Sequence, residues 1–182
     1  MRLAPIAALV LFAACFTAAC DDATGVLAKG GWAASFTETG ETCNTLSHNG
    51  MVGQVSTGDA SGVSIDGTDG ADITCAVYAS GGGFTASGSA SQNGYSLTIS
   101  IGEISGDNTA DNPANGTASF ASPQTITAFT SNMPCKFFFT GEQLVDTGKI
   151  WVSFTCDDVE NGMQMCAISN GVAAFEDCDT SP

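Results

Sequence analysis

Positive charge is scarce in this chain. Lys and Arg together number 4 among 182 residues, against 19 Asp and Glu, which gives a formal net charge of −15. Nucleic-acid affinity and binding to anionic membrane surfaces both depend mainly on Lys and Arg, so the composition argues against either function. Charged residues are only 13% of the chain and hydrophobic residues are 43%. The sequence therefore has enough apolar material for a packed core and is not a disordered acidic tail.

Catalytic signatures are also missing. The single His, His48, precedes the turn signal Asn49-Gly50, and any Ser/His/Asp or Cys/His catalytic set would depend on it. We interpret His48 as a surface turn residue. The chain has no Gly-x-Ser-x-Gly elbow, Walker sequence or dinucleotide fingerprint. The run Gly81–Gly83 lacks the Lys of a phosphate loop and is interpreted as a hairpin connection. The sequence offers no catalytic residue.

The amino terminus has the pattern of an export signal. Arg2 is followed by an apolar run over residues 3–14 and by small residues up to Cys20, after which the chain becomes polar at Asp21-Asp22. One positive charge, a short apolar run and a small-residue cleavage zone are typical of a secretory signal peptide. The run is too short for a lasting transmembrane helix. We expect residues 1–19 to be removed.

The last residues of this signal, Thr17-Ala18-Ala19-Cys20, resemble the lipobox of bacterial lipoproteins, although that family most often has Leu where this chain has Thr17. The resemblance covers residues 1–22 and implies cleavage before Cys20 and acylation of that residue. Cleavage before Cys15 is a second candidate, but it leaves an odd number of Cys for an oxidising compartment. An ordinary secretory signal cut near Ala19 is the other alternative.

The resemblance implies a domain organisation and a location. Residues 20–31 would form the lipidated Cys and a tether, and residues 32–182 a single β domain. The acyl chains would hold the protein to a membrane of the bacterial cell envelope, facing the periplasm or the outer surface. The domain itself resembles small disulfide-bonded, β-rich envelope lipoproteins.

Period-two alternation of apolar and polar residues recurs after the tether, most clearly over 95–101, 150–156 and 73–77. A weaker run at 84–90 has small residues on its apolar face, which leaves room for a neighbouring layer. The pattern predicts an all-β fold, an antiparallel sandwich or barrel of about nine or ten short strands. Residues 104–115 read as a long loop, and residues 143–146 as a possible helical turn.

Asn-Gly occurs five times, and this dipeptide suits tight hairpin turns because both residues tolerate positive φ. We predict that Asn93-Gly94 joins strands 84–91 and 95–102. We predict a second hairpin at Asn170-Gly171, between strands 163–169 and 172–177.

Cleavage before Cys20 and acylation of that residue leave six other Cys, and export favours three disulfides among them. Fifteen connectivities are possible. The preferred set is Cys43–Cys75, Cys156–Cys166 and Cys135–Cys178. The chain has no Cys-x-x-Cys motif, so a metal site built on these residues is disfavoured.

Two acidic segments supply the only abundant functional groups. Asp66, Asp69 and Asp72 lie in one segment, and Asp107 and Asp111 lie in the other. Flexible loops of this composition are candidate Ca²⁺ ligands, although neither has EF-hand spacing. Turn formation is the interpretation that we favour, because Asp, Asn and Gly are the residues that tight turns use. We therefore expect no cofactor.

Aromatic residues raise one open question. Tyr95 falls on the apolar face of its strand and is assigned to the core. Trp151 falls on the opposite face of its own strand, which is either a second buried layer or a ligand surface. The function that we expect is a non-enzymatic envelope lipoprotein whose β domain displays loops, structurally or to a glycan or protein. The alternative is a carboxylate-dependent hydrolase of envelope or extracellular polysaccharide.

Overall fold

A computed structural model describes residues 25–39 and 42–182, so the predicted signal peptide and Cys20 lie outside the described residues. The described chain is all β, with no helix, as predicted. It has fourteen strands, more than the nine or ten expected. They are Lys29–Thr37 (β1), His48–Val52 (β2), Gln54–Ser56 (β3), Asp59–Gly62 (β4), Ser64–Ile65 (β5), Asp72–Ser80 (β6), Gly83–Gln92 (β7), Tyr95–Ile104 (β8), Ala114–Ala121 (β9), Phe129–Ser131 (β10), Cys135–Phe138 (β11), Leu144–Asp146 (β12), Lys149–Glu160 (β13) and Met165–Glu176 (β14).

Two boundaries differ from expectation. β1 begins at Lys29, so residues 29–31 belong to the sheet rather than to the predicted tether. β12 pairs with β13 through residues 144–146, where a helical turn was expected. The loop between β8 and β9 lies where it was predicted.

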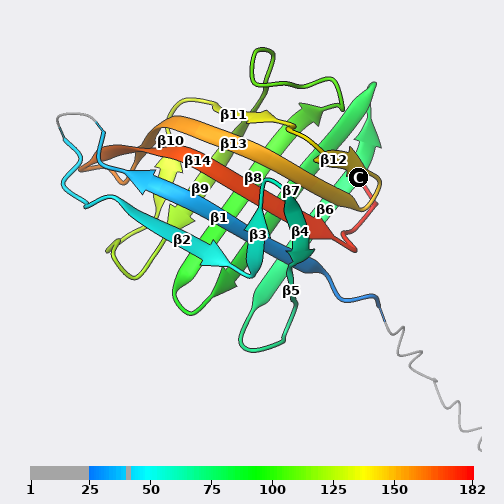
Figure 1. The fold of residues 1–182 in the computed structure, drawn as a ribbon, viewed down its shortest axis with the longest axis horizontal. Coiled ribbons are helices and arrows are strands. Elements are labelled where there is room, and N and C mark those ends of the chain that lie inside the picture. The colour runs from blue at the N-terminus through cyan, green and yellow to red at the C-terminus, as the bar shows by residue number, and fades with distance from the viewer. Residues whose placement is uncertain (1–24, 40–41) are drawn as a thin grey trace, which may run out of the picture.

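Twelve strands form one antiparallel sheet that folds over into two layers (Figure 1). The first layer has the order β2-β1-β14-β13, and the second has the order β9-β8-β7-β6. The short strands β10 and β11 each pair with both β13 and β9 and so join the layers at one corner. The hairpin β3–β4 lies over the outer face of the first layer (Figure 1).

The chain end closes the opposite corner. We name residues 177–180 the C-terminal strap. The N–H of Val77 donates to the carbonyl of Asp179 at 2.8 Å, and the N–H of Asp179 donates to the carbonyl of Cys75 at 3.0 Å. The N–H of Gly148 also donates to the carbonyl of Val77 at 3.0 Å. The strap therefore satisfies backbone groups of the β6 edge that would otherwise face solvent.

Large rings from the first layer fill the core against small residues of β7. The ring of Phe175 lies on Gly88, where an added Cβ would be only 2.5 Å from a ring carbon. Trp32 is fully buried, and its Nε1–H donates to the carbonyl of Ala90 at 2.9 Å. The small residues noted in the sequence at 84–90 thus form a recess for a facing layer, as predicted. Tyr95 packs against the same core.

The two predicted Asn-Gly hairpins have opposite outcomes. Asn93 and Gly94 have φ of 53° and 82° and join β7 to β8, as predicted. Asn170-Gly171 is not a turn, because β14 runs straight through it and pairs with β1 and β13. The residue opposite Gly171 in β13 is Phe154, whose ring would lie 2.4 Å from a Cβ at position 171. Gly is present there to admit a ring, and the hairpin from β13 to β14 uses residues 161–164 instead.

Three disulfides form, as expected, but the preferred pairing is wrong throughout. The bonds are Cys43–Cys166, Cys75–Cys178 and Cys135–Cys156. The predicted pairing assumed that residues after 160 turn back on themselves in a hairpin. Because β14 is instead one long strand beside β1, its two ends reach different parts of the molecule. Its first end meets the loop before β2, and the chain after its last end meets β6.

The open question about Trp151 also has an answer. The β3–β4 hairpin covers the outer face of the first layer and forms a second small core of Val55, Val172 and Ala174, with Trp151 packed against it. The Nε1–H of Trp151 donates to the carbonyl of Ser56 at 3.0 Å. That face is a second buried layer.

Candidate functional site

The acidic segments behave as turns. The carboxylate of Asp66 accepts a hydrogen bond from the N–H of Ile73 at 2.8 Å, and Asp69 has a positive φ of 51°. The side chain of Gln92, the last residue of β7, donates to the carbonyl of Asp69, so the first acidic segment lies at that end of β7. Asp107 and Asp111 follow Ile104, the last residue of β8, which pairs with Phe84 at the beginning of β7. The structure thus keeps the two segments apart.

A metal site built on these residues gains no support. Within residues 25–39 and 42–182, no group of three or more His, Cys, Asp or Glu side chains is placed to hold an ion. The same described residues contain no helix that is long and apolar enough to cross a membrane. Three disulfides are typical of an oxidising environment outside the cytoplasm.

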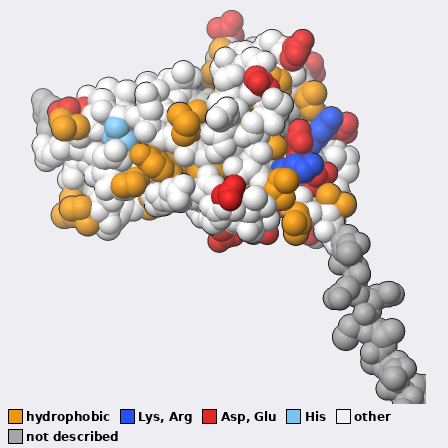
Figure 2. Space-filling model, turned by 60° about the horizontal axis from the view of Figure 1, so that its bottom comes forward, with side chains coloured by type: hydrophobic (Ala, Val, Ile, Leu, Met, Phe, Trp, Pro, Cys, Tyr) orange, Lys and Arg blue, Asp and Glu red, His pale blue; other side chains and the backbone are white. Residues whose placement is uncertain are grey.

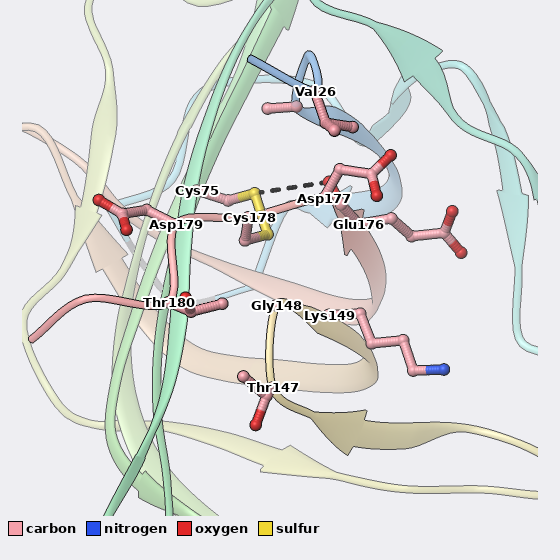
Figure 3. A pocket seen from close by; sticks show the side chains of 11 residues that line it. Val26, Cys75, Thr147, Gly148, Lys149, Glu176, Asp177, Cys178, Asp179 and Thr180 are labelled. Carbon is pink, nitrogen blue, oxygen red and sulfur yellow. Dashed lines mark hydrogen bonds between the residues drawn. A yellow bond between two sulfur atoms is a disulfide. The ribbon is translucent and has the colours of Figure 1, made fainter. Parts of the chain in front are cut away.

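Carboxylates also line a depression of about 850 Å³ beside the C-terminal strap (Figure 3). Asp177 there is ion-paired with Lys29 at 2.9 Å. The N–H of Ser181 donates to the carboxylate of Asp179, which lowers the pKa of that carboxyl. A general acid of a glycoside hydrolase needs a raised pKa. Asp179 is therefore not prepared for that role, and Asp177 is engaged in its ion pair.

His48 connects two loops. Its Nδ1 lies 2.8 Å from the carbonyl of Leu46, and its Nε2 lies 2.8 Å from the hydroxyl of Ser122. A carbonyl can only accept, so Nδ1 carries a proton and donates to Leu46, and Nε2 shares a second hydrogen bond with the hydroxyl of Ser122. Both ring nitrogens are therefore engaged in structure. The ring also packs against Phe36 and Phe120.

The two loops that His48 connects and the turn between β13 and β14 carry the most exposed large apolar side chains among the described residues. Ile126 is 99% exposed, Met163 is 77% exposed and Leu46 is 76% exposed. All three line one depression of about 470 Å³, together with polar but uncharged residues. We name Leu46, Ile126 and Met163 the apolar tip. Exposed apolar side chains that gather in one place mark interaction sites more often than scattered ones do.

The tip lies at the opposite end of the domain from residues 25–28, which precede β1. β1 leaves Lys29 near the strap and ends at Thr37 near the tip, and β14 returns from Met165 to Glu176. Figure 2 shows hydrophobic side chains at both ends of the molecule, whereas the Lys side chains in view lie at one end. Nine residues of β1 extend about 30 Å at roughly 3.3 Å per residue.

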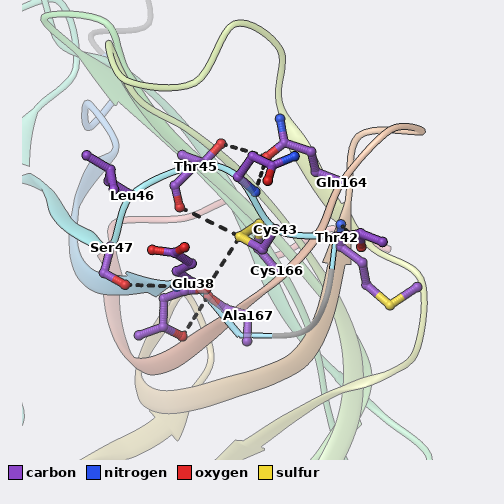
Figure 4. Close-up of a disulfide and its surroundings, with 12 residues drawn as sticks. Glu38, Thr42, Cys43, Thr45, Leu46, Ser47, Gln164, Cys166 and Ala167 are labelled. Carbon is purple, nitrogen blue, oxygen red and sulfur yellow. Dashed lines mark hydrogen bonds between the residues drawn. A yellow bond between two sulfur atoms is a disulfide. The ribbon is translucent and has the colours of Figure 1, made fainter.

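Covalent and hydrogen bonds hold the tip loops in place. The Cys43–Cys166 disulfide ties the loop before β2 to the start of β14. The side-chain oxygen of Gln164 accepts from the N–H of Asn44 at 2.8 Å and from the hydroxyl of Thr45 at 3.1 Å (Figure 4). The Asn161 side chain accepts from the backbone N–H groups of Met163 and Gln164. The tip is therefore a preorganised surface, which lowers the entropic cost of binding.

Sequence reasoning did not find this site. Leu46, Ile126 and Met163 are large apolar residues that lie between the strands of the structure. The alternation pattern had instead placed Met163 at the start of the predicted strand 163–169. The sequence does not show that the loops carrying Leu46, Ile126 and Met163 lie next to one another.

Comparisons with known proteins identify no relative: no family, no curated protein and no solved structure matches this chain. The geometry of the site therefore carries the functional argument alone.

Proposed function

We propose that this chain is a non-enzymatic lipoprotein of the bacterial cell envelope, held to a membrane through Cys20, whose β domain presents the apolar tip to a protein partner. The observation that carries the proposal is the placement of Leu46, Ile126 and Met163 on braced loops at the end remote from the N-terminal segment. A chain attached at its amino terminus projects this end away from its anchor.

The chemistry of the tip favours protein over other partners. Glycans stack on aromatic rings, and none lies among the described residues that line the depression. Membrane-surface segments use Lys, Arg, Trp and Tyr, which are likewise missing from that lining, and the net charge of −15 opposes anionic lipid. Met adapts its shape to irregular apolar surfaces. An apolar and uncharged protein surface is the matching partner.

A photo-crosslinking amino acid at position 126 tests the proposal in the native bacterium. We expect one discrete adduct, because a specific partner presents one surface. The triple variant Leu46→Ser, Met163→Ser, Thr45→Ala should lose that adduct. The control carries the same crosslinker and the changes Met51→Ser and Leu144→Ser, which lie away from the tip and are 55% and 40% exposed. It should keep the adduct, and thermal unfolding should confirm that both variants are folded.

Other occupants give different results. An adduct twice the mass of the chain, together with a dimer in sedimentation that the triple variant abolishes, would show that a second copy covers the tip. Tip-dependent flotation with liposomes would show insertion into lipid. Either result, or an adduct that persists in the triple variant, contradicts the proposed partner.

The anchor is tested separately. Wild type should partition with membranes and detergent, because several acyl chains anchor durably at about 0.8 kcal/mol per buried CH₂. Cys20→Ser should not be processed by the lipoprotein route, whereas Cys15→Ser should behave as wild type. Recovery of wild type as a soluble protein starting near Asp21 would contradict lipidation and leave the tip untouched.

A further inference from the structure

The three disulfides differ in their accessibility. Cys43, Cys135, Cys156 and Cys166 are at most 5% exposed. Cys178 is also buried, but its partner Cys75 is half-buried and lines depressions on two sides of the second layer. One depression measures about 850 Å³ and the other about 380 Å³. Figure 3 shows the Cys75–Cys178 bond in the middle of the larger depression. A small thiol can approach this disulfide while the domain stays folded.

The same disulfide has a mechanical role that the others lack. It joins the end of the first layer, just after β14, to β6 at the open edge of the second layer. Cys135–Cys156 connects β11 to its sheet neighbour β13, and Cys43–Cys166 connects a loop to β14. Beside the Cys75–Cys178 bond, the strap is held to β6 by the two backbone hydrogen bonds between Val77, Cys75 and Asp179.

We propose that Cys75–Cys178 is a thiol–disulfide exchange site for a small dithiol reductant and that its reduction releases the C-terminal strap from β6. The reductant thiolate attacks Sγ of Cys75, which belongs to the more exposed of the two residues, and forms a mixed disulfide with it. Cys178 leaves as a thiolate and takes a proton. The second thiol of the reductant then attacks its own sulfur in the mixed disulfide and releases Cys75. The protein gains two electrons and two protons, and the dithiol becomes a disulfide.

Charge around the bond selects the reductant. Glu176, Asp177 and Asp179 line the larger depression together with Lys149, and Lys29 is paired with Asp177. Carboxylates close to the attacked sulfur repel an anionic thiol and attract a cationic one. We expect this discrimination to weaken as salt screens the charges.

Release of the strap has a structural result. Cys75, Ala76 and Val77 belong to the β6 edge, and their outward backbone groups are satisfied by the strap and by Gly148. Once the disulfide is open, residues 177–180 are held only by non-covalent contacts: these bonds, the hydrogen bond from the N–H of Cys178 to the carbonyl of Gly148, and the ion pair of Asp177 with Lys29. An uncovered edge strand is a template for pairing with another chain.

The test uses the full chain with Cys15→Ser and Cys20→Ser, so that every thiol detected comes from a disulfide. Native protein is treated briefly with dithiothreitol, alkylated, and mapped by mass spectrometry. We expect Cys75 and Cys178 to be labelled on the order of tenfold faster than the other four, because these open only with larger unfolding. Cys135–Cys156 in the same molecule is the internal control. Equal labelling of all three disulfides, or earlier labelling of another, overturns the proposal.

Two further measurements test its parts. Cysteamine, a cationic thiol, should form the mixed disulfide faster than the anionic mercaptoethanesulfonate, with a ratio that falls as salt rises. Amide hydrogen exchange at Val77 and Asp179 should accelerate after selective reduction, while exchange in β13 stays unchanged. Unchanged exchange at Val77 contradicts strap release. The variant Cys75→Ser, Cys178→Ser should reproduce the faster exchange without reductant, and the labelling of the native disulfides decides the proposal even if this variant does not fold.

Discussion

Rings reach the core from β1 and β14, whereas β7 meets them with glycine and alanine. Trp32 and Phe175 are fully buried, and the facing strand offers Ala86, Gly88 and Ala90. The two strands contribute differently to this contact. β1 and β14 supply large rings, and β7 supplies the space for them because its side chains are small or absent. Removing a ring leaves a cavity, whereas adding an atom to β7 creates a steric clash with the ring. Substitutions on β14 and on β7 should therefore destabilise the fold by different mechanisms.

The largest effect should come from the projecting side. Phe175→Ala removes a fully buried ring that the small residues of β7 cannot replace. We expect a loss of about 3–5 kcal/mol in the free energy of unfolding, measured by urea denaturation. Phe138→Ala, at a half-buried site on β11, should cost clearly less. Equal losses in the free energy of unfolding for the two variants would show that packing of Phe175 against β7 is no more stabilising than the contacts of Phe138.

The recess itself is tested by one added methyl group. Gly88→Ala places a Cβ within 2.5 Å of the Phe175 ring, and overpacking of this kind costs about 1–3 kcal/mol. Gly102→Ala is the matched control, since it lies in the neighbouring strand with nothing within 4 Å of its Cβ. That change should be neutral or slightly stabilising, because alanine has less backbone freedom to lose. A neutral Gly88→Ala would mean that the ring moves freely.

A smaller effect should come from the polar contact between the two sides. Trp32→Phe keeps most of the ring but removes the Nε1–H that donates to the carbonyl of Ala90. A net hydrogen bond contributes about 1 kcal/mol, and we expect a loss of that order in denaturant melts. A loss several times larger would indicate that ring size, not the hydrogen bond, dominates at this position.

The smallest effect concerns pH and the strap rather than the core. The N–H of Ser181 donates to the carboxylate of Asp179 and lowers its pKa. A lowered folded-state pKa stabilises the fold at pH above the unfolded value of about 3.9, and this contribution disappears as pH falls through the folded value. Asp179→Asn should remove a small acid dependence of the melting temperature between about pH 5 and pH 3. An unchanged acid profile in the variant would assign that dependence to other carboxyls.

Local features of the fold were predictable because they depend on neighbouring residues. Alternation over 95–101 predicts β8, and Asn93-Gly94 predicts its turn, since both depend on backbone preferences within a few residues. Asn170-Gly171 shows the limit of the same rule. Gly171 accommodates the ring of Phe154 from another strand, and nothing near position 171 in the sequence reports that ring.

Features that join distant segments were not predictable in the same way. The disulfide partners follow from the pairing of β14 with β1, which are separated by most of the chain. The apolar tip likewise requires three loops to meet, and the sequence pattern placed one of its residues, Met163, in a predicted strand rather than in a turn. Composition indicated the class of fold, but contacts between distant strands determine the site.

The pairing of β1 with β14 also sets the order of events during synthesis. β1 spans residues 29–37, and its long partner spans residues 165–176. The first layer cannot assemble until the ribosome has made almost the whole described chain, so folding from the amino terminus during translation is blocked. Distant pairing also slows folding because loops must close before contacts form. The architecture therefore postpones assembly of the first layer until β14 has been made, whereas the consecutive strands β6 to β9 can pair earlier.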